Sequence, residues 1–192
     1  MSILKNIITT TYHLRMKISK LTGLGIRINK NENQISAPET IYRLSARLNK
    51  GEEISFERYR DKKLLIVNLA SKCGYTPQYR ELESLHQKNE DLVILGFPSN
   101  NFGDQEPGTD EDIAGFCRIN FNVTFPLFLK NHVIGKSKQP VYEWLTNKDK
   151  NGWNDLEPRW NFYKYLIDEN GNLLNVFSPA VSPLDIKIVA RN

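Results

Sequence analysis

The sequence predicts an α/β fold built on a central sheet that is covered on both faces. Two nearly continuous apolar runs, at 64–70 and 92–97, are typical of strands that are buried on both sides. Between them, residues 77–88 place Leu82 and Leu85 on one face of a helix. A strand, a helix and a second strand form a βαβ unit, so we expect a parallel pair with a right-handed crossover.

The flanking segments predict a hairpin before this unit and a helix after it. Apolar and polar residues alternate at 42–48, as a half-buried strand requires, and a turn at 49–51 leads to a second strand at 53–56. After the unit, Thr109 is followed by acidic residues in a capping-box-like pattern. This pattern predicts a helix that runs to about residue 120.

The C-terminal part predicts a second hairpin and a final helix. Asn170 and Gly171 lie between apolar runs at 162–167 and 173–177, and Asn-Gly in this setting is the strongest short hairpin signal. Residues 182–185 place a cap and a first-turn proline at the start of a helix. The whole order is that of a thioredoxin-like fold with an N-terminal β-hairpin and an inserted helix.

Charge divides the chain into two parts. Residues 1–31 hold six basic residues and no acidic one, which leaves 20 of the 26 basic residues against all 22 acidic ones in the remainder. The body is therefore mildly acidic and offers no basic surface for nucleic acid, although the net charge of the chain is +4. We assign residues 1–37 to a basic extension, either helical or flexible, and residues 38–192 to the folded domain.

The extension leaves three interpretations open. It fits an organelle transit peptide, a helix that lies on a membrane surface, or a short helix and linker without a targeting function. It lacks the continuous apolar core and the small-residue cleavage site of a secretory signal. No run of roughly 18 apolar residues occurs, so we expect no membrane-spanning helix and a cytoplasmic protein. Its apolar residues fall roughly on one helical face: Ile3, Leu4, Ile7, Leu14, Ile18 and Leu21.

Cys73 is the first candidate for a reactive group. It follows a buried strand and precedes a helix, which is where reactive groups gather in open α/β sheets. Backbone N–H groups and the positive end of the helix are expected to lower the pKa of its thiol. Thr76 stands where a thioredoxin-type Cys-x-x-Cys has its second sulfur, and we expect its hydroxyl to donate to the thiolate. Such a site favours attack on an electrophile such as a peroxide, whereas the alternative is an inert, buried cysteine.

Three segments carry a resemblance to a known family. They are 68–76 (NLASKCGYT), 95–108 (LGFPSNNFGDQEPG) and 160–168 (WNFYKYLID). In this order and at these separations they resemble the active-site segment and two further signatures of glutathione peroxidases. The match covers about residues 38–190. It implies a thiol peroxidase that reduces hydrogen peroxide and organic hydroperoxides and needs no bound cofactor.

By position, the family's catalytic group corresponds to Cys73, Gln105, Trp160 and Asn161. Amide and indole N–H groups are donors that stabilise a thiolate over a thiol, and they can also stabilise charge on a departing oxygen. Taken singly, Trp160 is more often a core aromatic and Gln105 a solvated loop residue. Only the joint occurrence of the four residues supports the assignment.

The sequence departs from the family pattern in three places. Cys73 stands where several animal members carry selenocysteine, which implies slower chemistry. Ser99 and Asn101 replace the Cys and the first Gln often found in the second signature. We expect these changes to tune the activity rather than to abolish it. Only about 15 residues separate Leu145 from Trp160. This resembles the short-loop members and implies a monomer rather than a tetramer.

Cys117 bears on the reductant. It resembles the resolving cysteine of two-cysteine members, which use a thioredoxin-like reductant in place of glutathione. The implied cycle oxidises Cys73 to a sulfenic acid, which Cys117 then converts to a disulfide. A disulfide needs Cα atoms within about 7 Å, and we expect the two sulfurs, 44 residues apart in the sequence, to start farther apart. The helix that bears Cys117 would then have to unwind, and Gly115 weakens it. The alternative is that Cys117 only fills the core.

Two other functions remain open from the sequence. A thiol–disulfide oxidoreductase is disfavoured by Thr76, which cannot form a disulfide with Cys73. A peroxide sensor that passes its disulfide to a client protein would use the same residues as the peroxidase. Metal binding is not expected, because the three histidines are scattered and two cysteines cannot close a zinc site: His13, His86 and His132.

Overall fold

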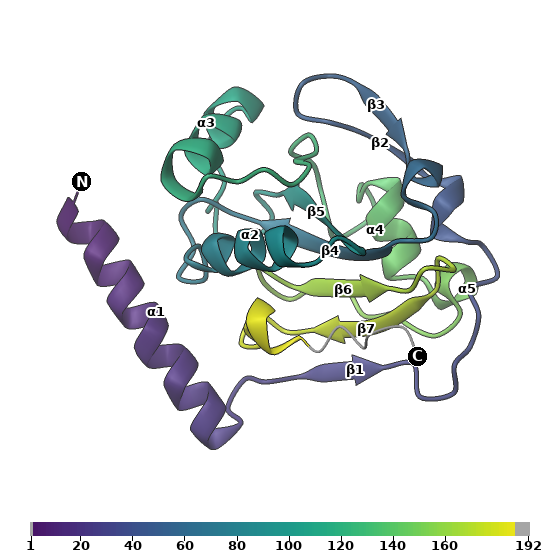
Figure 1. Cartoon of the computed structure of the whole chain (residues 1–192), viewed down its shortest axis with the longest axis horizontal. Helices are drawn as coiled ribbons and strands as arrows, with labels where there is room; N and C mark the ends of the chain where they lie inside the picture. Colours follow the sequence, from purple (N-terminus) through teal and green to yellow (C-terminus); the bar gives the residue numbers. More distant parts are fainter. Residues whose placement is uncertain (1, 187–192) are drawn as a thin grey trace.

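The computed structural model describes residues 2–186. The strands are β1 (Ile28–Lys30), β2 (Ser45–Arg47), β3 (Glu53–Ser55), β4 (Lys63–Leu69), β5 (Leu92–Pro98), β6 (Lys164–Ile167) and β7 (Leu173–Phe177). The helices are α1 (Ser2–Thr22), α2 (Gln78–Lys88), α3 (Asp110–Phe121), α4 (Pro140–Leu145) and α5 (Lys148–Asn151). A five-stranded sheet in the order β1-β7-β6-β4-β5 forms the centre, and β2 and β3 pair beside it (Figure 1).

The predicted βαβ unit is present at the middle of the sheet. β4 and β5 pair in parallel, with Leu64 opposite Val93, and α2 connects them. On the other side of β4 the sheet continues with β6 and β7, each antiparallel to its neighbour. With the β2–β3 hairpin before the unit and α3 inserted after it, this arrangement confirms the predicted thioredoxin-like fold.

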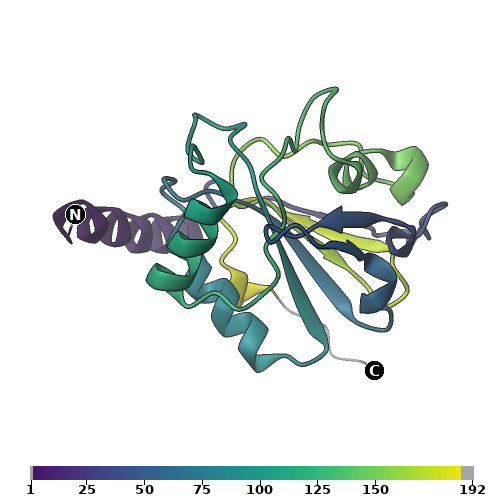
Figure 2. The same ribbon diagram turned by 90° about the horizontal axis from the view of Figure 1, so that it is seen from above.

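Side-chain alternation along β4 explains why the sheet is covered on both faces. Leu64 and Ile66 belong to a core shared with the hairpin and α4, whereas Leu65 and Val67 belong to a second core under α2 and α3. All four are fully buried. Figure 2 shows α2 and α3 on one side of the sheet and α4 and α5 on the other.

The structure differs from the prediction at the ends of several elements. Residues Ile41–Arg43 form a 3-10 turn capped by Thr40, so the first hairpin strand begins only at Ser45. α4 and α5 were not predicted, because six and four residues are too short to show a helical period. Ser182 caps a 3-10 turn at Pro183–Asp185, and the continuation of the expected final helix lies outside the described residues.

The β6–β7 hairpin turns at Asn170 and Gly171, as predicted. Gly171 has a φ of +84°, and a Cβ there would collide with the side chains of Thr40 and Tyr42. Both the left-handed backbone and the close approach require glycine. The turn therefore also fixes where the start of the domain packs.

The N-terminal extension contacts the body through both β1 and α1. β1 pairs with β7 at the edge of the sheet, with Ile28 opposite Phe177. On α1, the Tyr12 hydroxyl donates to one carboxylate oxygen of Glu81 at 2.6 Å, and Ser182 donates to the other at 2.5 Å. One carboxylate on α2 thus links both ends of the described chain. No helix among the described residues is long and apolar enough to cross a membrane.

Candidate active site

Cys73 lies in the turn between β4 and α2, as the sequence predicts. The Cys73 N–H donates to Thr76 Oγ1 at 3.0 Å, and the Thr76 hydroxyl donates to the Ala70 carbonyl at 2.9 Å. Because this hydroxyl proton is used on the backbone, the expectation that Thr76 donates to the sulfur is wrong. Thr76 instead holds the turn in shape.

Four groups from three parts of the chain stabilise negative charge on the Cys73 sulfur. The Tyr75 N–H donates to Sγ at 3.4 Å. The Trp160 indole and the Asn161 amide lie close enough to act on the thiol, and the Arg15 guanidinium of α1 adds positive charge. Each of them lowers the pKa of the thiol. The fold thus brings Trp160 and Asn161 to Cys73, and it adds Arg15, which the sequence analysis had left in the extension.

Burial nevertheless outweighs these donors. Cys73 is only 1% exposed. Desolvation disfavours the thiolate and raises the pKa of the Cys73 thiol from its ordinary value of 9.0. The lowered pKa expected from the sequence is therefore wrong in sign, because the motif does not show how much apolar surface closes over the sulfur. The hydrogen-bond donors around Cys73 still stabilise the negative charge that develops on its sulfur when the thiol loses its proton.

Gln105 joins the group through Asn161. The Asn161 Nδ2 donates to Gln105 Oε1 at 3.0 Å, which orients the amide. The backbone carbonyl of Gln105 accepts from the Lys72 N–H at 3.0 Å, so the loop is fastened to the Cys73 turn. Gln105 is thus placed to position Asn161, and no contact of its side chain with the sulfur is seen among the described residues.

Asn68 is a positioning residue that the sequence analysis missed. Its Nδ2 donates to the Trp160 carbonyl at 3.0 Å, and its Oδ1 accepts from the Tyr163 N–H at 2.9 Å. Its own carbonyl accepts from the Phe162 N–H at 2.7 Å. Asn68 is fully buried, and a polar residue inside the apolar run of β4 was the available signal.

Phe162 follows Asn161 in a backbone conformation that bulky residues rarely adopt. Its φ is +66°, in the left-handed region. Such strain persists only where the surroundings fix it, and here the Asn68 contacts do so. The strained residue turns the chain between Asn161, which faces Cys73, and β6, which enters the sheet.

Cys117 lies in α3 and belongs to the same apolar core as Cys73. Both cysteines are free thiols. Burial raises the pKa of Cys117 to about 12; the nearby Tyr79 hydroxyl opposes the rise and the charge of Glu106 adds to it. Cys117 is therefore protonated and shielded where it stands.

Glu106 and Tyr79 are buried polar groups close to Cys117 that the sequence analysis did not select. Burial raises the pKa of Glu106 to about 7. Its Oε2 and the Tyr79 hydroxyl make no aligned hydrogen bond within the described part of the chain. Beside Glu106 lies a hollow of about 350 Å³, between the Cys73 turn and α3, whose lining includes Ser71 and Phe116. On the side of α3 that faces this hollow, the helix therefore makes few apolar contacts.

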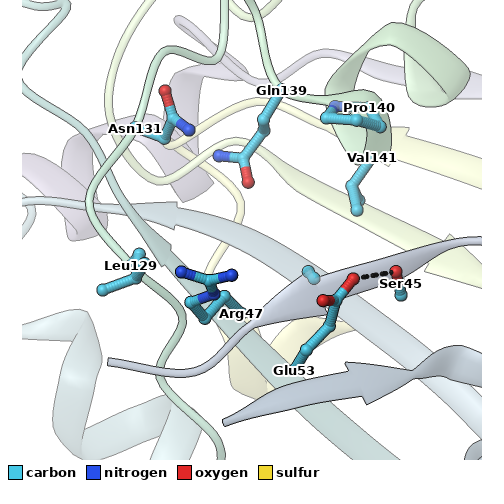
Figure 3. A pocket seen from close by; sticks show the side chains of 9 residues that line it. Ser45, Arg47, Glu53, Leu129, Asn131, Gln139, Pro140 and Val141 are labelled. Atoms are coloured by element: carbon cyan, nitrogen blue, oxygen red, sulfur yellow. Dashed lines mark hydrogen bonds between the residues drawn. The ribbon is translucent and has the colours of Figure 1, made fainter. Parts of the chain in front are cut away.

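A separate hollow of about 200 Å³ lies between the β2–β3 hairpin and the chain that leads into α4 (Figure 3). Arg47 and Glu53 line it from the hairpin, and Asn131 and Gln139 line it from the opposite side. No predicted site residue contributes to its lining. Residues 2–186 contain no group of three or more His, Cys, Asp or Glu side chains that could hold a metal ion.

Comparison with known proteins gives consistent matches. A family model described as glutathione peroxidase matches residues 41–146. The chain is 47% identical over 150 residues to the glutathione peroxidase homolog BsaA of Halalkalibacterium halodurans, which covers 77% of this chain and 95% of that protein. It is 45% identical over 146 residues to glutathione peroxidase-like peroxiredoxin 2 of Saccharomyces cerevisiae, covering 75% and 90%. The crystal structure of Trgpx in apo form matches with a TM-score of 0.62 and 34% identity, over 78% of this chain and 92% of that one.

Proposed function

The chain belongs to the glutathione peroxidase family, as its sequence resemblance predicts, and we propose that it is a thiol peroxidase in which Cys73 attacks the peroxide and Cys117 resolves the product. The observation that carries the proposal is the placement of the Trp160–Asn161 segment beside the turn of Cys73, where hydrogen bonds to Asn68 and Gln105 hold it. The yeast relative is named a glutathione peroxidase-like peroxiredoxin, which supports a peroxide as the oxidant.

In the first step the Cys73 thiol gives up its proton and the sulfur attacks one peroxide oxygen. The O–O bond breaks, the sulfur becomes a sulfenic acid, and the departing oxygen takes a proton and leaves as water or an alcohol. Donors aimed at the sulfur stabilise it as charge develops, and they are equally placed for the departing oxygen. Trp160 and Asn161 supply these donors, and Gln105 keeps Asn161 in position.

In the second step the Cys117 sulfur attacks the sulfenic sulfur of Cys73. The S–S bond forms, and the sulfenic hydroxyl leaves as water with the proton from Cys117. Cys117 is fully buried and its pKa is raised to about 12, so local opening of α3 would expose the thiol and favour the thiolate that attacks. The helix ends at Phe121, only four residues after Cys117, and we infer that it opens from this end back to Ala114, over about two turns that include Gly115.

A thioredoxin-like dithiol is the reductant that best fits this cycle. Because Cys117 supplies the second sulfur from within the chain, no glutathione is needed to attack the sulfenic acid. The resulting disulfide is then reduced by exchange with an external dithiol, which leaves oxidised. Glutathione is the alternative donor.

Rapid mixing with hydrogen peroxide, followed by steady-state turnover with thioredoxin or glutathione, tests the proposal. Cys73→Ser should abolish both oxidation and turnover, and substantial remaining activity would refute the assignment of Cys73. Cys117→Ser should still be oxidised once but should no longer cycle with thioredoxin. Mixed disulfides trapped in that variant would distinguish a general reductant from a single client protein, as expected for a peroxide sensor.

The proposal extends to the part of the chain that is active, its oligomeric state and its location. We assign the activity to residues 38–192, with the extension adding α1 and β1. The segment between α4 and Trp160 holds only the one-turn helix α5, which leaves no inserted loop for tetramer contacts, so a monomer is expected. A cytoplasmic location suits two free thiols that cycle through a disulfide. Light scattering after size exclusion checks the oligomeric state.

A further inference from the structure

Over residues 10–22, where the structure describes all side chains except that of Lys20, helix α1 is apolar on two opposite faces, of which one is covered. Tyr12 and Met16 face the body and are 1% and 7% exposed. Leu14, Ile18 and Leu21 are 60%, 45% and 87% exposed. Because each residue turns an α-helix by about 100°, these three form a stripe directly opposite Tyr12 and Met16. A surface helix of a soluble protein needs one apolar face, so the second face is left for a partner.

The charge of the extension indicates which partner fits this face. Residues 1–31 carry no acidic residue. Lys17 is exposed on one side of the stripe, and Arg15 is exposed on the other side, with its guanidinium over the Tyr75 ring. An apolar stripe flanked by basic side chains matches the surface of a bilayer that contains anionic lipid. A second copy of the same helix would instead bring like charges together.

We propose that α1 docks the protein on anionic lipid bilayers through the stripe formed by Leu14, Ile18 and Leu21. Leu24, which is 71% exposed, continues this stripe beyond the end of the helix. The helix forms the edge of the molecule and leads into β1 (Figure 1), so a bilayer can reach it without contact with the sheet.

The docking face adjoins the side of the molecule that holds Cys73. A groove of about 360 Å³ is lined by Leu14, Ile18 and Leu24 on one side and by Tyr75 on the other. The N–H of Tyr75 is the group that donates to the Cys73 sulfur at 3.4 Å. A bilayer in contact with the stripe therefore lies at the mouth of a groove that ends next to this residue.

Cosedimentation of the full chain with vesicles tests the proposal. Two probes are used, vesicles of phosphatidylcholine alone and vesicles that also contain phosphatidylglycerol. Binding is expected with the anionic vesicles and should weaken as salt is added. The variant Leu14→Gln/Ile18→Gln/Leu21→Gln should bind them on the order of 100-fold more weakly, since it removes three apolar contacts.

A matched control carries the same three changes on other exposed apolar residues, as Ile119→Gln/Leu156→Gln/Leu184→Gln. These residues are 77%, 49% and 56% exposed, and the control should bind as the wild type does. Circular dichroism and the thermal midpoint verify that both variants are folded. Absence of vesicle binding by the wild type, or equal binding by the stripe variant, overturns the proposal. A concentration-dependent dimer that only the stripe variant loses also overturns it, because the stripe then meets a second copy.

Discussion

The Arg15 guanidinium of α1 lies 4.9 Å from the centre of the Tyr75 ring and packs against the turn that carries Cys73. A Cβ on Gly74 would lie 3.3 Å from Arg15 Nη1, so the arginine rests on the backbone next to the nucleophile. The N-terminal extension therefore contributes a charge to the active site. This contact joins two segments that are nearly 60 residues apart in the sequence.

Arg15→Gln is expected to raise the pKa of Cys73 further. The pKa is already above the ordinary value of 9.0 because of burial, and the positive charge of Arg15 opposes that rise. A thiol reacts with peroxide as the thiolate, so the wild-type rate of oxidation should keep increasing with pH through 9.0, and the curve of the variant should lie at higher pH. Thiolate absorbance and the rate of alkylation against pH both measure this shift. Lys17→Gln removes an equal charge from the exposed side of α1, and a shift of the same size in that control would deny Arg15 a specific role.

Trp160→Phe is expected to slow the oxidation of Cys73 by about 100-fold, the usual cost of losing one donor from an oxyanion-type site. The substitution keeps an aromatic ring but removes the indole N–H together with the rest of the five-membered ring, so the control has to lose the same atoms. Trp153→Phe is the matched control, because its indole donates to the Leu173 carbonyl at 2.7 Å, away from the site. That variant should lose stability without a change in the rate. Rapid-mixing kinetics with hydrogen peroxide compares the two, and similar rates would remove Trp160 from the catalytic group.

The sequence was sufficient for the sheet and for the residues that meet at Cys73, because both depend on local signals. The apolar run of β4, the cap at Thr109 and the turn at Gly171 each act within a few residues. The family motifs indicated Trp160 and Asn161, which the fold places near Cys73, while their catalytic role stays a prediction. These strand, cap and turn signals can be recognised without knowing which distant segments pack against them.

The parts that were missed depend on packing between distant segments. The raised pKa of Cys73 results from burial under several elements, which no motif of nine residues records. Arg15 reaches the site because α1 packs on the body, where Tyr12 donates to Glu81. Asn68 was visible as a polar residue in an apolar strand, but its hydrogen bonds to the Trp160 segment appear only in three dimensions.

Cys117 is expected to make stability depend on pH in the alkaline range. Its pKa is about 12 in the folded chain and 9.0 in the unfolded one. Above that lower value the unfolded state releases a proton that the folded state keeps, so the contribution of Cys117 to the free energy of unfolding falls as pH rises. The stability difference between wild type and Cys117→Ala should therefore shrink by about 1 kcal/mol between roughly pH 9 and pH 10. Urea unfolding at both pH values measures it. Ile113→Ala, in the same core but without a titratable group, should show a constant difference.

The opening of α3 can be tested with a pair of opposite substitutions. Gly115 has no atom within 4 Å of the place where a Cβ would stand and no positive φ, so Gly115→Ala fits without strain. Alanine stabilises a helix interior by about 1 kcal/mol relative to glycine. The helix should therefore open less often, and the Cys73–Cys117 disulfide should form about 5-fold more slowly. Ala114→Gly, one residue earlier, should accelerate the same step by a similar factor.

Oxidation of Cys73 to the sulfenic acid precedes the opening of α3, so it should be unchanged in both variants. Trapping of the sulfenic acid and mass spectrometry of the disulfide follow the two steps separately. Equal rates of disulfide formation in Gly115→Ala, Ala114→Gly and the wild type would show that Cys117 reaches Cys73 without unwinding its helix.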